Sequence, residues 1–380
     1  MSLQSLVFCS DDKILRVLRR VLSDLEIQME HCLSADSAIH KITRQRFEAI
    51  IVDCADAETT SKILRSIKNA PCNRRAVAVA IIDTQTALRG AFDLGAHFVL
   101  YKPISMERAK TSFRAARALM KSERRRNQRV PVQIPVAFYT SEGARQETLT
   151  SDLGEGGMAV QAAKLPRRAD QQLRAQFTLP DTDFVCDCGV EVAWENTAKQ
   201  SGVRFLEMAP EVRERLRGWF NQHSAIPEVD DPPMACKLTD LSTGGCYLET
   251  STPFPVRAKV ALSLALKDAK VHVSGVVRVM HPEKGMGVEF NQATEAQSSL
   301  VEDFLGTLNS GEVANPELLV EPEGLESGDP TEEENSESNL SVYDPLLELF
   351  RRGLDLDVEE FHSEMQKQRR SKAKKAAISI

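Results

Sequence analysis

The chain has 380 residues, enough for two or three domains that each bury a core, so a single-domain protein is not expected. Its formal charge of −7 is too small to indicate a partner, but its distribution is uneven, with a basic stretch at 108–129 and an acidic one after Gly311. No run approaches the roughly 20 apolar residues that span a bilayer, and Asp11 to Lys13 come too early for a secretory signal, which predicts a cytoplasmic protein.

The first 120 residues alternate between apolar runs typical of buried strands and segments with helical periodicity. The runs are Leu6 to Cys9, Ala49 to Val52, Val77 to Ile82 and Phe98 to Tyr101, and the helical segments include Ile14 to Leu25 and Asp36 to Arg46. Buried strands interleaved with helices predict a doubly wound α/β domain over residues 1–120. In such domains, ligand chemistry lies at the carboxyl ends of the strands.

Charged residues follow three of these strand-like runs. Asp11 and Asp12 come after the first run, Asp53 after the next and Lys102-Pro103 after the last. Clustered carboxylates can hold Mg²⁺ through oxygen ligands, and a neighbouring lysine can neutralise a phosphoryl group. This arrangement resembles a response-regulator receiver domain.

The resemblance implies a role for each of these residues. Asp53 would be the phosphoacceptor, Asp11, Asp12 and Asp53 would hold Mg²⁺, Lys102 would contact the phosphoryl group, and a sensor kinase would be a partner. The sequence departs from the family at the switch hydroxyl, whose place falls near Asp83 or Thr84. A carboxylate there would repel a phosphoryl group. We therefore expect a degenerate receiver domain, in which phosphorylation of Asp53 is an open question.

From Arg129 onward, short β-rich runs separated by Gly, Pro and Asp predict an antiparallel barrel. The pattern then recurs along the chain. Residues 151–157 correspond to 239–245 at an offset of 88, and residues 202–205 correspond to 287–290 at an offset of 85. Two motifs in the same order at nearly constant spacing predict a duplicated barrel, over 121–226 and 233–308.

Two motifs of the first copy outline an anion site. Arg124, Arg125, Arg126 and Arg129 precede the barrel, and the sequence Asp152-Leu153-Gly154-Glu155-Gly156-Gly157 follows a predicted strand pair. Arginine forks give bidentate, permanently charged contacts to phosphate. A glycine-rich turn lets backbone amides approach a ligand that a side chain would block.

The order and spacing of these motifs resemble the PilZ family, small β-barrels that bind cyclic di-GMP. Members carry Arg-x-x-x-Arg before the barrel, matched here by Arg125 and Arg129, and (Asp/Asn)-x-Ser-x-x-Gly on an early strand, matched at its ends by Asp152 and Gly157. Gly154 stands at the serine position and removes one hydroxyl contact. The resemblance implies that cyclic di-GMP binds through Arg124, Arg125, Arg129, Asp152, Gly154, Gly156 and Gly157.

The second copy shows the opposite combination. It keeps Asp240-x-Ser242-x-x-Gly245, but the preceding residues 228–237 contain no arginine and three acids. Without a cationic partner, it should bind a dianionic nucleotide poorly. We interpret it as a structural barrel that packs against the first copy or binds protein.

The end of the chain has two parts. Ten acids and no Lys or Arg between Gly311 and Leu340 predict a disordered linker at 309–340. In the tail at 341–380, apolar spacing favours two short amphipathic helices, followed by six basic residues between Lys367 and Lys375. The tail could dock on a partner, touch anionic lipid or fold back on the acidic linker.

No pattern indicates an enzyme. The seven histidines show no metal-ligand spacing, and no nucleophilic serine turn, Walker lysine loop or dinucleotide fingerprint occurs. We predict a cytoplasmic signalling adaptor that binds cyclic di-GMP through its first barrel and relays the change to an unidentified partner protein. The alternatives are a ligand-free scaffold for protein interactions and, less expected, a nucleic-acid binder acting through residues 108–129.

Overall fold

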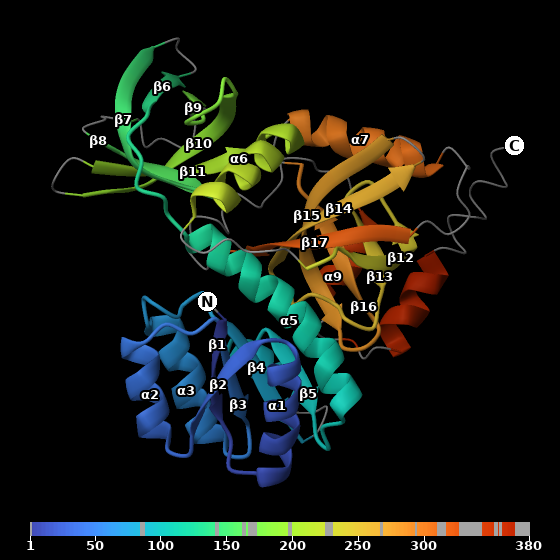
Figure 1. Ribbon diagram of the computed structural model, residues 1–380. Coiled ribbons are helices and arrows are strands. Elements are labelled where there is room, and N and C mark those ends of the chain that lie inside the picture. Colours follow the sequence, from blue (N-terminus) through green and yellow to red (C-terminus); the bar gives the residue numbers. More distant parts are fainter. Residues whose placement is uncertain are drawn as a thin grey trace, which may run out of the picture. The chain divides into compact units, whose positions relative to one another are not determined.

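The computed structural model describes residues 2–83, 88–140, 144–161, 165, 173–196, 200–224, 231–266, 269–292, 295–309, 317–326, 344–352, 356 and 359–368. The chain divides into two compact units. One is Arg124–Asp230, and the other combines Ser2–Glu123 with Asp231–Ile380. The first unit holds one β-barrel, and the second holds an α/β domain and another barrel (Figure 1).

The α/β domain has a five-stranded parallel sheet in the order β2-β1-β3-β4-β5, which confirms the predicted doubly wound, receiver-like fold. Every residue of β3 and β4 is buried, because helices cover both faces of the sheet. The elements are β1 (Leu3–Phe8), α1 (Asp12–Asp24), β2 (Ile27–Cys32), α2 (Ala35–Arg44), β3 (Ala49–Asp53), α3 (Ala57–Asn69), β4 (Val77–Ile82), α4 (Leu88–Asp93) and β5 (Phe98–Tyr101).

Helix α5 (Met106–Asn127) follows the sheet and joins the two units. Its Phe113, Leu119 and Met120 are buried in an apolar core that also contains residues of the α/β sheet and of the second barrel. The boundary between the units falls inside this helix, after Glu123. None of the helices in the described residues is both long enough and apolar enough to cross a membrane.

The first barrel is closed by six antiparallel strands in the order β10-β11-β8-β7-β6-β9, as predicted. Its interior is filled by alternate residues of each strand together with Leu216 and Trp219 of α6. The elements are β6 (Pro135–Thr140), β7 (Arg145–Gly154), β8 (Gly157–Gln161), β9 (Leu173–Thr178), β10 (Val185–Glu195), β11 (Gln200–Glu207) and α6 (Pro210–His223).

The second barrel is also closed, in the order β12-β13-β16-β15-β14-β17. Its elements are β12 (Met234–Leu241), β13 (Gly245–Glu249), β14 (Ala258–Leu266), β15 (Ala269–His281), β16 (Gly285–Phe290), α7 (Glu295–Asn309) and β17 (Glu317–Leu325). The two barrels share irregular positions. The β7–β8 register shifts between Thr150 and Asp152, and the β12–β13 register shifts between Leu238 and Asp240. The duplication predicted from sequence is therefore visible in the strand pairing.

Strand β17 corrects one prediction. The sequence predicts a disordered linker over residues 309–340, yet Glu317–Leu325 pairs with β12 and β14 and completes the second barrel. It takes the place that β6 has beside β7 and β9 in the first barrel. Among the residues that the structure describes, the second copy has no strand before β12, so without β17 two strand edges would stay open. The other residues of 309–340 lie outside the described part, apart from Asn309 at the end of α7 and Glu326.

The two amphipathic helices predicted in the tail are present. Helix α9 (Pro345–Arg352) buries Leu346, Leu349 and Phe350. A second helix over residues 359–368 buries Phe361 and Met365. Both helices contribute to one apolar cluster with β13 and β15 of the second barrel. The basic residues beyond Lys367 lie outside the described residues.

Candidate functional site

Asp53 and Lys102 form an ion pair at the carboxyl edge of the parallel sheet. Asp53 is the last residue of β3 and Lys102 follows β5, so the sheet order brings them together. Lys102 Nζ lies 2.6 Å from Asp53 Oδ1, and the Lys102-Pro103 peptide bond is cis, as predicted. Asp83, which is exposed after β4, lies 3.5 Å from the same Nζ. Thr84 is outside the described residues.

Asp11 and Asp12 lie at the start of helix α1. Asp11 is the N-cap of α1, and its Oδ1 accepts hydrogen bonds from the backbone N–H groups of Lys13 at 2.7 Å and Ile14 at 3.3 Å. These hydrogen bonds lower the pKa of Asp11. Asp12 is exposed in the first helical turn. The sequence placed both acids correctly after β1, but it did not show that helix α1 begins there and uses Asp11 as its cap.

A thiol contacts Asp53 from the β1 side. Cys9 Sγ donates a hydrogen bond to Asp53 Oδ2 at 3.4 Å, and burial raises the pKa of Cys9 to about 11. A neutral thiol is a poor ligand for Mg²⁺, which prefers oxygen. Within the described ranges, no group of three His, Cys, Asp or Glu residues is arranged to hold a metal ion. The metal roles of Asp11, Asp12 and Asp53 therefore stay a prediction.

In the first barrel, Arg129 lies across the glycine-rich turn. Its Nη1 donates a hydrogen bond to the Gly157 carbonyl oxygen at 2.7 Å and lies 3.4 Å from Asp152 Oδ1. Backbone hydrogen bonds between Val130 and Leu153, in both directions, set this position by pairing the arginine segment with β7. Three residues predicted from sequence to share a site, Arg129, Asp152 and Gly157, are thus brought together.

Close packing explains two glycines of the motif. A Cβ on Gly157 would lie 2.1 Å from the Val203 carbonyl oxygen of β11, a position that only glycine can occupy without a backbone shift. A Cβ on Gly154 would lie 2.9 Å from Arg129 Cδ. The family's serine position is therefore covered by the side chain of Arg129. Gly156 has open space around it, with no atom of a described residue within 4 Å of a Cβ built there.

Arg125 reaches the same turn from the last turn of α5. Its Nε lies 3.6 Å from Glu155 Oε2, and both side chains are largely buried. Arg124 precedes it in the same helical turn. Glu155 and Gly156 form the two-residue loop between β7 and β8, where Gly154 pairs with Gly157. The carboxylate of Glu155 therefore extends from this loop toward Arg125.

Helix α6 supplies two arginines that the sequence analysis did not identify. Arg217 Nε donates a hydrogen bond to Glu155 Oε1 at 3.1 Å. Arg213, one turn earlier, has its pKa lowered by burial and by the positive charge of Arg217. Their spacing of four residues places them on one face of α6 and could have drawn attention to them. Glu155 thus lies among guanidinium groups from two helices.

The matching turn of the second barrel has no such cluster in the described residues. Ser242 and Gly245 bond to each other: the Gly245 N–H donates to Ser242 Oγ at 3.1 Å, and the Ser242 N–H donates to the Gly245 carbonyl oxygen at 2.8 Å. The intact family motif therefore forms a regular closed turn. The hydroxyl that Gly154 lacks is used here within the loop.

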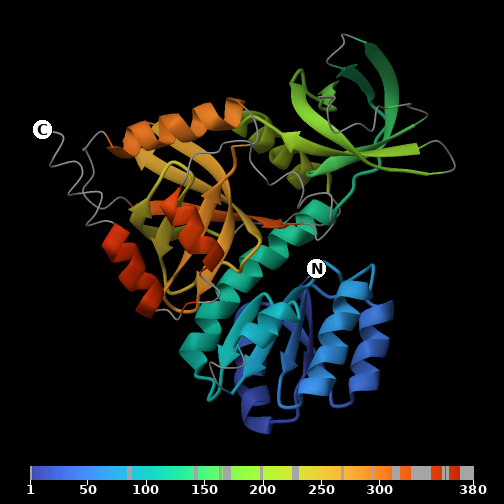
Figure 2. The ribbon, with the colours of Figure 1, turned by 180° about the vertical axis from the view of Figure 1, so that it is seen from behind.

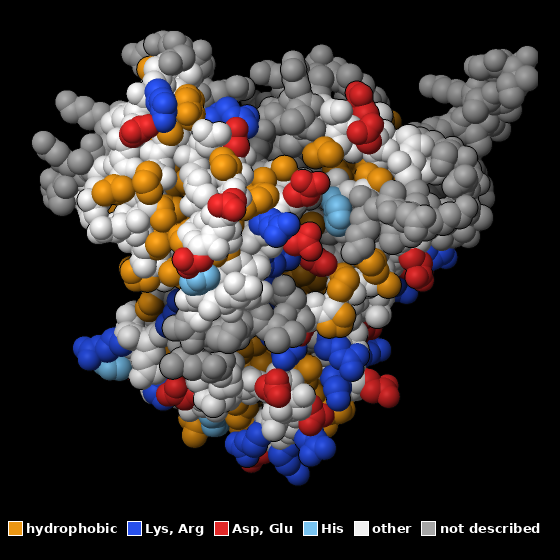
Figure 3. All heavy atoms as spheres, turned by 45° about the horizontal axis from the view of Figure 1, so that its top comes forward, with side chains coloured by type: hydrophobic (Ala, Val, Ile, Leu, Met, Phe, Trp, Pro, Cys, Tyr) orange, Lys and Arg blue, Asp and Glu red, His pale blue; other side chains and the backbone are white. Residues whose placement is uncertain are grey.

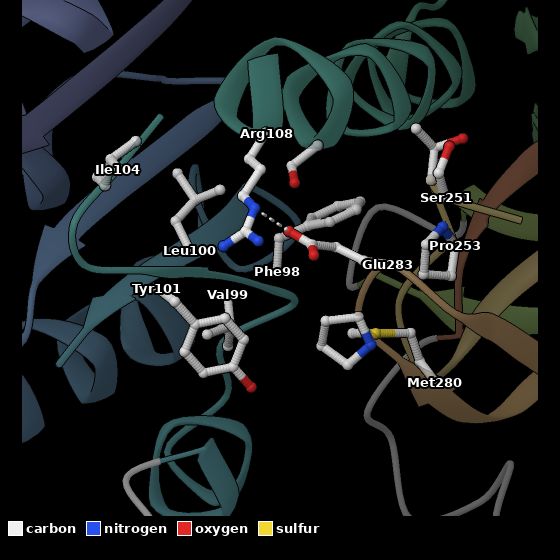
Figure 4. Close-up of a pocket in the computed structure, with 13 residues that line it drawn as sticks. Phe98, Val99, Leu100, Tyr101, Ile104, Arg108, Ser251, Pro253, Met280 and Glu283 are labelled. Carbon is white, nitrogen blue, oxygen red and sulfur yellow. Dashed lines mark ion pairs between the residues drawn. The ribbon is translucent and has the colours of Figure 1, made fainter. Parts of the chain in front are cut away.

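A small pocket lies elsewhere in the second unit, between β5 and the end of β15. Figure 4 shows Arg108 of α5 facing Glu283, and Arg108 Nε lies 3.2 Å from Glu283 Oε1. Tyr101 and Met280 line the opposite sides. Burial and the charge of Glu283 raise the pKa of Tyr101, so its hydroxyl stays neutral. We assign no ligand to this pocket, because Arg108 and Glu283 already neutralise each other.

Together these features define a β-barrel with several arginines around one glycine-rich turn, linked by one helix to a receiver-like domain. Residues 123–222 and 220–306 each match the PilZ domain family. The chain therefore carries two PilZ domains behind a receiver-like α/β domain. No curated protein matches the chain.

Several solved structures are similar to parts of the chain. The receiver domain of a sensor histidine kinase from Pseudomonas aeruginosa, crystallised with magnesium, is 21% identical over 32% of this chain and 99% of its own, with a TM-score of 0.28. The PilZ domain of CeSA from a cellulose-synthesizing bacterium is 16% identical over 25% and 98%, with a TM-score of 0.21. An adenylate cyclase structure from Rhodopirellula baltica is 21% identical over 30% and 87%, with a TM-score of 0.27.

Proposed function

We propose that the first PilZ barrel binds cyclic di-GMP and that the protein is a regulatory adaptor which passes this signal to a partner protein. Tandem PilZ domains with a receiver-like domain support a signalling adaptor in general. The observation that carries the specific ligand is the position of Arg129, which spans the turn from Asp152 to Gly157. Its guanidinium can pair with a phosphate or stack on a guanine face.

The contacts of Glu155 support the same proposal. This carboxylate accepts a hydrogen bond from Arg217 at 3.1 Å and lies 3.6 Å from Arg125. Without a ligand, the Glu155 carboxylate occupies the anion position between these guanidinium groups. A phosphate of the nucleotide would take over these groups and release Glu155 from the arginines. Glu155 therefore holds the arginines in position for a phosphate, but it also competes with the phosphate for them.

The relay is proposed to run through α5. The helix carries Arg125 near its carboxyl end, while its Phe113 and Leu119 are packed in the core of the other unit. We propose that nucleotide binding fixes the arginine segment against the first barrel and changes its orientation relative to the receiver-like domain. Scattering profiles that are identical with and without saturating cyclic di-GMP would contradict this step.

Phosphorylation of Asp53 is a further part of the proposal. Its carboxylate is paired with Lys102 at 2.6 Å, as a phosphoacceptor would be. The carboxylate of Asp83, 3.5 Å from Lys102, would oppose a phosphoryl group by charge. Acetyl phosphate should label the wild type but not Asp53→Ala. Equal labelling of the two proteins would remove Asp53 from this role.

The nucleic-acid alternative is weakened by what the basic residues of α5 contact. Arg117 and Lys121 both pair with Asp231, and Arg108 pairs with Glu283. On the face shown in Figure 3, basic side chains are interspersed with acidic ones. Phosphates would have to displace these internal partners, so a steep, salt-dependent affinity for DNA is not expected.

Calorimetric titration of the full-length protein with cyclic di-GMP tests the proposal most directly. Arg129→Ala and Arg125→Ala should each weaken binding at least tenfold, because each removes charged hydrogen bonds of about 1.5–3 kcal/mol. Arg145→Ala is the matched control, because Arg145 pairs with Glu147 at the opposite end of β7 from Gly154. At about 3.3 Å per residue, the two ends of the strand lie roughly 30 Å apart. The same titration is repeated with GTP and, over a series of salt concentrations, with duplex DNA.

The outcomes separate the three functions. Tight binding of cyclic di-GMP alone, lost in Arg129→Ala but kept in Arg145→Ala, supports the sensor. No binding of any nucleotide leaves the protein-interaction scaffold. Binding of DNA that falls steeply with salt favours the nucleic-acid binder. All eight cysteines are free thiols, which agrees with the cytoplasmic location that is part of this proposal.

A further inference from the structure

The glycine turns of the two barrels have different surroundings. Gly156 and Gly244 occupy matching positions, 88 residues apart. A Cβ on Gly156 would meet no atom of a described residue within 4 Å, whereas a Cβ on Gly244 would lie 2.6 Å from Leu347 Cδ1 and 2.8 Å from Asp344 Oδ2. The turn of the second barrel is therefore covered by a segment that begins 100 residues further along the chain.

Asp344 makes the polar contact of this cover. Its Oδ2 accepts a hydrogen bond from the Gly244 N–H at 2.9 Å, and its Oδ1 accepts one from the Leu346 N–H at 2.9 Å. The first bond joins the segment to the barrel, and the second caps the start of α9. An acidic side chain thus satisfies a backbone amide of this turn, whereas the matching turn of the first barrel has open space at Gly156.

Apolar side chains complete the cover. Phe350 lies over β16, where a Cβ on Gly287 would be 2.5 Å from Phe350 Cε1. Phe361 from the following helix is fully buried, with its ring centroid 5.5 Å from that of Tyr247 on β13 and 4.5 Å from that of His281 on β15. Tyr247 is held in turn by a hydrogen bond between its hydroxyl and His281 Nδ1 at 2.9 Å.

The two tail helices act as one body. Phe350 and Phe361 are stacked with centroids 6.5 Å apart, and the Gln368 side chain donates a hydrogen bond to the Pro345 carbonyl oxygen at 3.1 Å. Figures 1 and 2 show α9 against the second barrel from opposite sides. Seven side chains of the shared cluster are buried: Tyr247, Val279, Leu346, Leu349, Phe350, Phe361 and Met365.

We infer that the second PilZ barrel is a docking module for an acid-capped amphipathic helix pair, and that residues 344–352 and 359–368 of the same chain are its occupant. The acid cap binds the Gly244 amide, and the aromatic residues pack on the strand face beside it. This barrel accordingly takes a peptide segment at the turn where the first barrel is proposed to take a nucleotide. The assignment does not depend on nucleotide binding by the first barrel.

Amide hydrogen exchange on the full-length protein tests this assignment. In the wild type, residues 345–352 and 244–249 should both be protected. Phe361→Ala should raise exchange in both segments together by at least tenfold, because loss of a fully buried phenylalanine weakens such docking by roughly 100-fold or more. Asp344→Ala should raise exchange mainly at Gly244. Glu359→Ala, on the exposed side of the same helix, is the matched control.

Three results would overturn the inference. The first is a tail that exchanges freely in the wild type. The second is protection that grows with protein concentration, since the tail would then cover a second copy. The third is an additional cyclic di-GMP site in Phe361→Ala that persists when Arg129→Ala is added. The turn of the second barrel would then be a nucleotide site that the tail covers. Unchanged exchange at residues 154–157 in Phe361→Ala shows that the first barrel stays folded.

Discussion

Removal of the charge on Glu155 should tighten nucleotide binding. In the resting protein this carboxylate is hydrogen-bonded to Arg217 at 3.1 Å and lies 3.6 Å from Arg125. A phosphate must displace it from both guanidinium groups. Glu155→Gln keeps the size and one oxygen of the side chain but removes the charge. The arginines then interact less strongly with the loop and more strongly with the ligand.

The size of the effect follows from the contacts that compete. A hydrogen bond to a charged group contributes about 1.5–3 kcal/mol, and Arg217 donates such a bond to Glu155. The side-chain amide introduced by Glu155→Gln would retain part of that bond, so we expect a gain of about 1.4 kcal/mol, which is tenfold in Kd. The unfolding free energy should fall by about 2 kcal/mol, because two largely buried guanidinium groups lose an acidic partner.

Calorimetry with cyclic di-GMP and thermal unfolding of the same samples measure both quantities. Glu147→Gln is the control, because Glu147 is an exposed acid on β7 that pairs with Arg145 at the far end of the strand. A tenfold loss of affinity in Glu155→Gln would refute the reasoning, since Glu155 would then position the arginines for the ligand and not compete with it.

Three further predictions concern other residues of the two sites. Gly154→Ser should tighten cyclic di-GMP binding up to fivefold in calorimetry, because it restores a hydrogen bond of about 1 kcal/mol and the Arg129 side chain near it can move. Gly157→Ala should lower the unfolding free energy by about 3 kcal/mol in denaturant titration, because its Cβ would strike the Val203 carbonyl; Gly156→Ala, with open space, should change it little. Iodoacetamide at pH 8 should modify exposed Cys72 well before Cys9, because a pKa of about 11 leaves roughly one thiolate in a thousand at Cys9; equal rates by mass spectrometry would contradict its burial.

The sequence predicted those parts of the fold that depend on local pattern. The four apolar runs of the α/β domain became β1, β3, β4 and β5, because fully buried parallel strands are continuous apolar stretches. The barrel motifs were found because glycine is required where strands approach closely, as at Gly157 and Val203. Arg129 was placed correctly because it pairs with β7 through its immediate neighbour, Val130.

Other features depended on contacts that composition does not show. Strand β17 was not predicted, because the acidic residues around it are typical of a disordered linker. Its buried Leu318 and Val320 nevertheless alternate as in a half-buried strand. Since the described residues before β12 include no strand of this barrel, another segment closes it. Arg217 was missed because it is separated from Glu155 by 62 residues and meets it only through the packing of α6.

The two turns show how one backbone arrangement can serve two partners. In the first barrel, guanidinium groups gather around a loop whose Gly156 is open, which favours a mobile anion. In the second, Asp344 is tethered to the barrel by the chain itself, and a tethered partner acts at an effective concentration of about 1 mM. A free anion at micromolar levels would need roughly 1,000-fold higher intrinsic affinity to replace it, without any arginine in residues 228–237 to provide this. The absence of arginines from residues 228–237 and the contact with Asp344 therefore act in the same direction, toward a second barrel that holds a segment of protein at this turn.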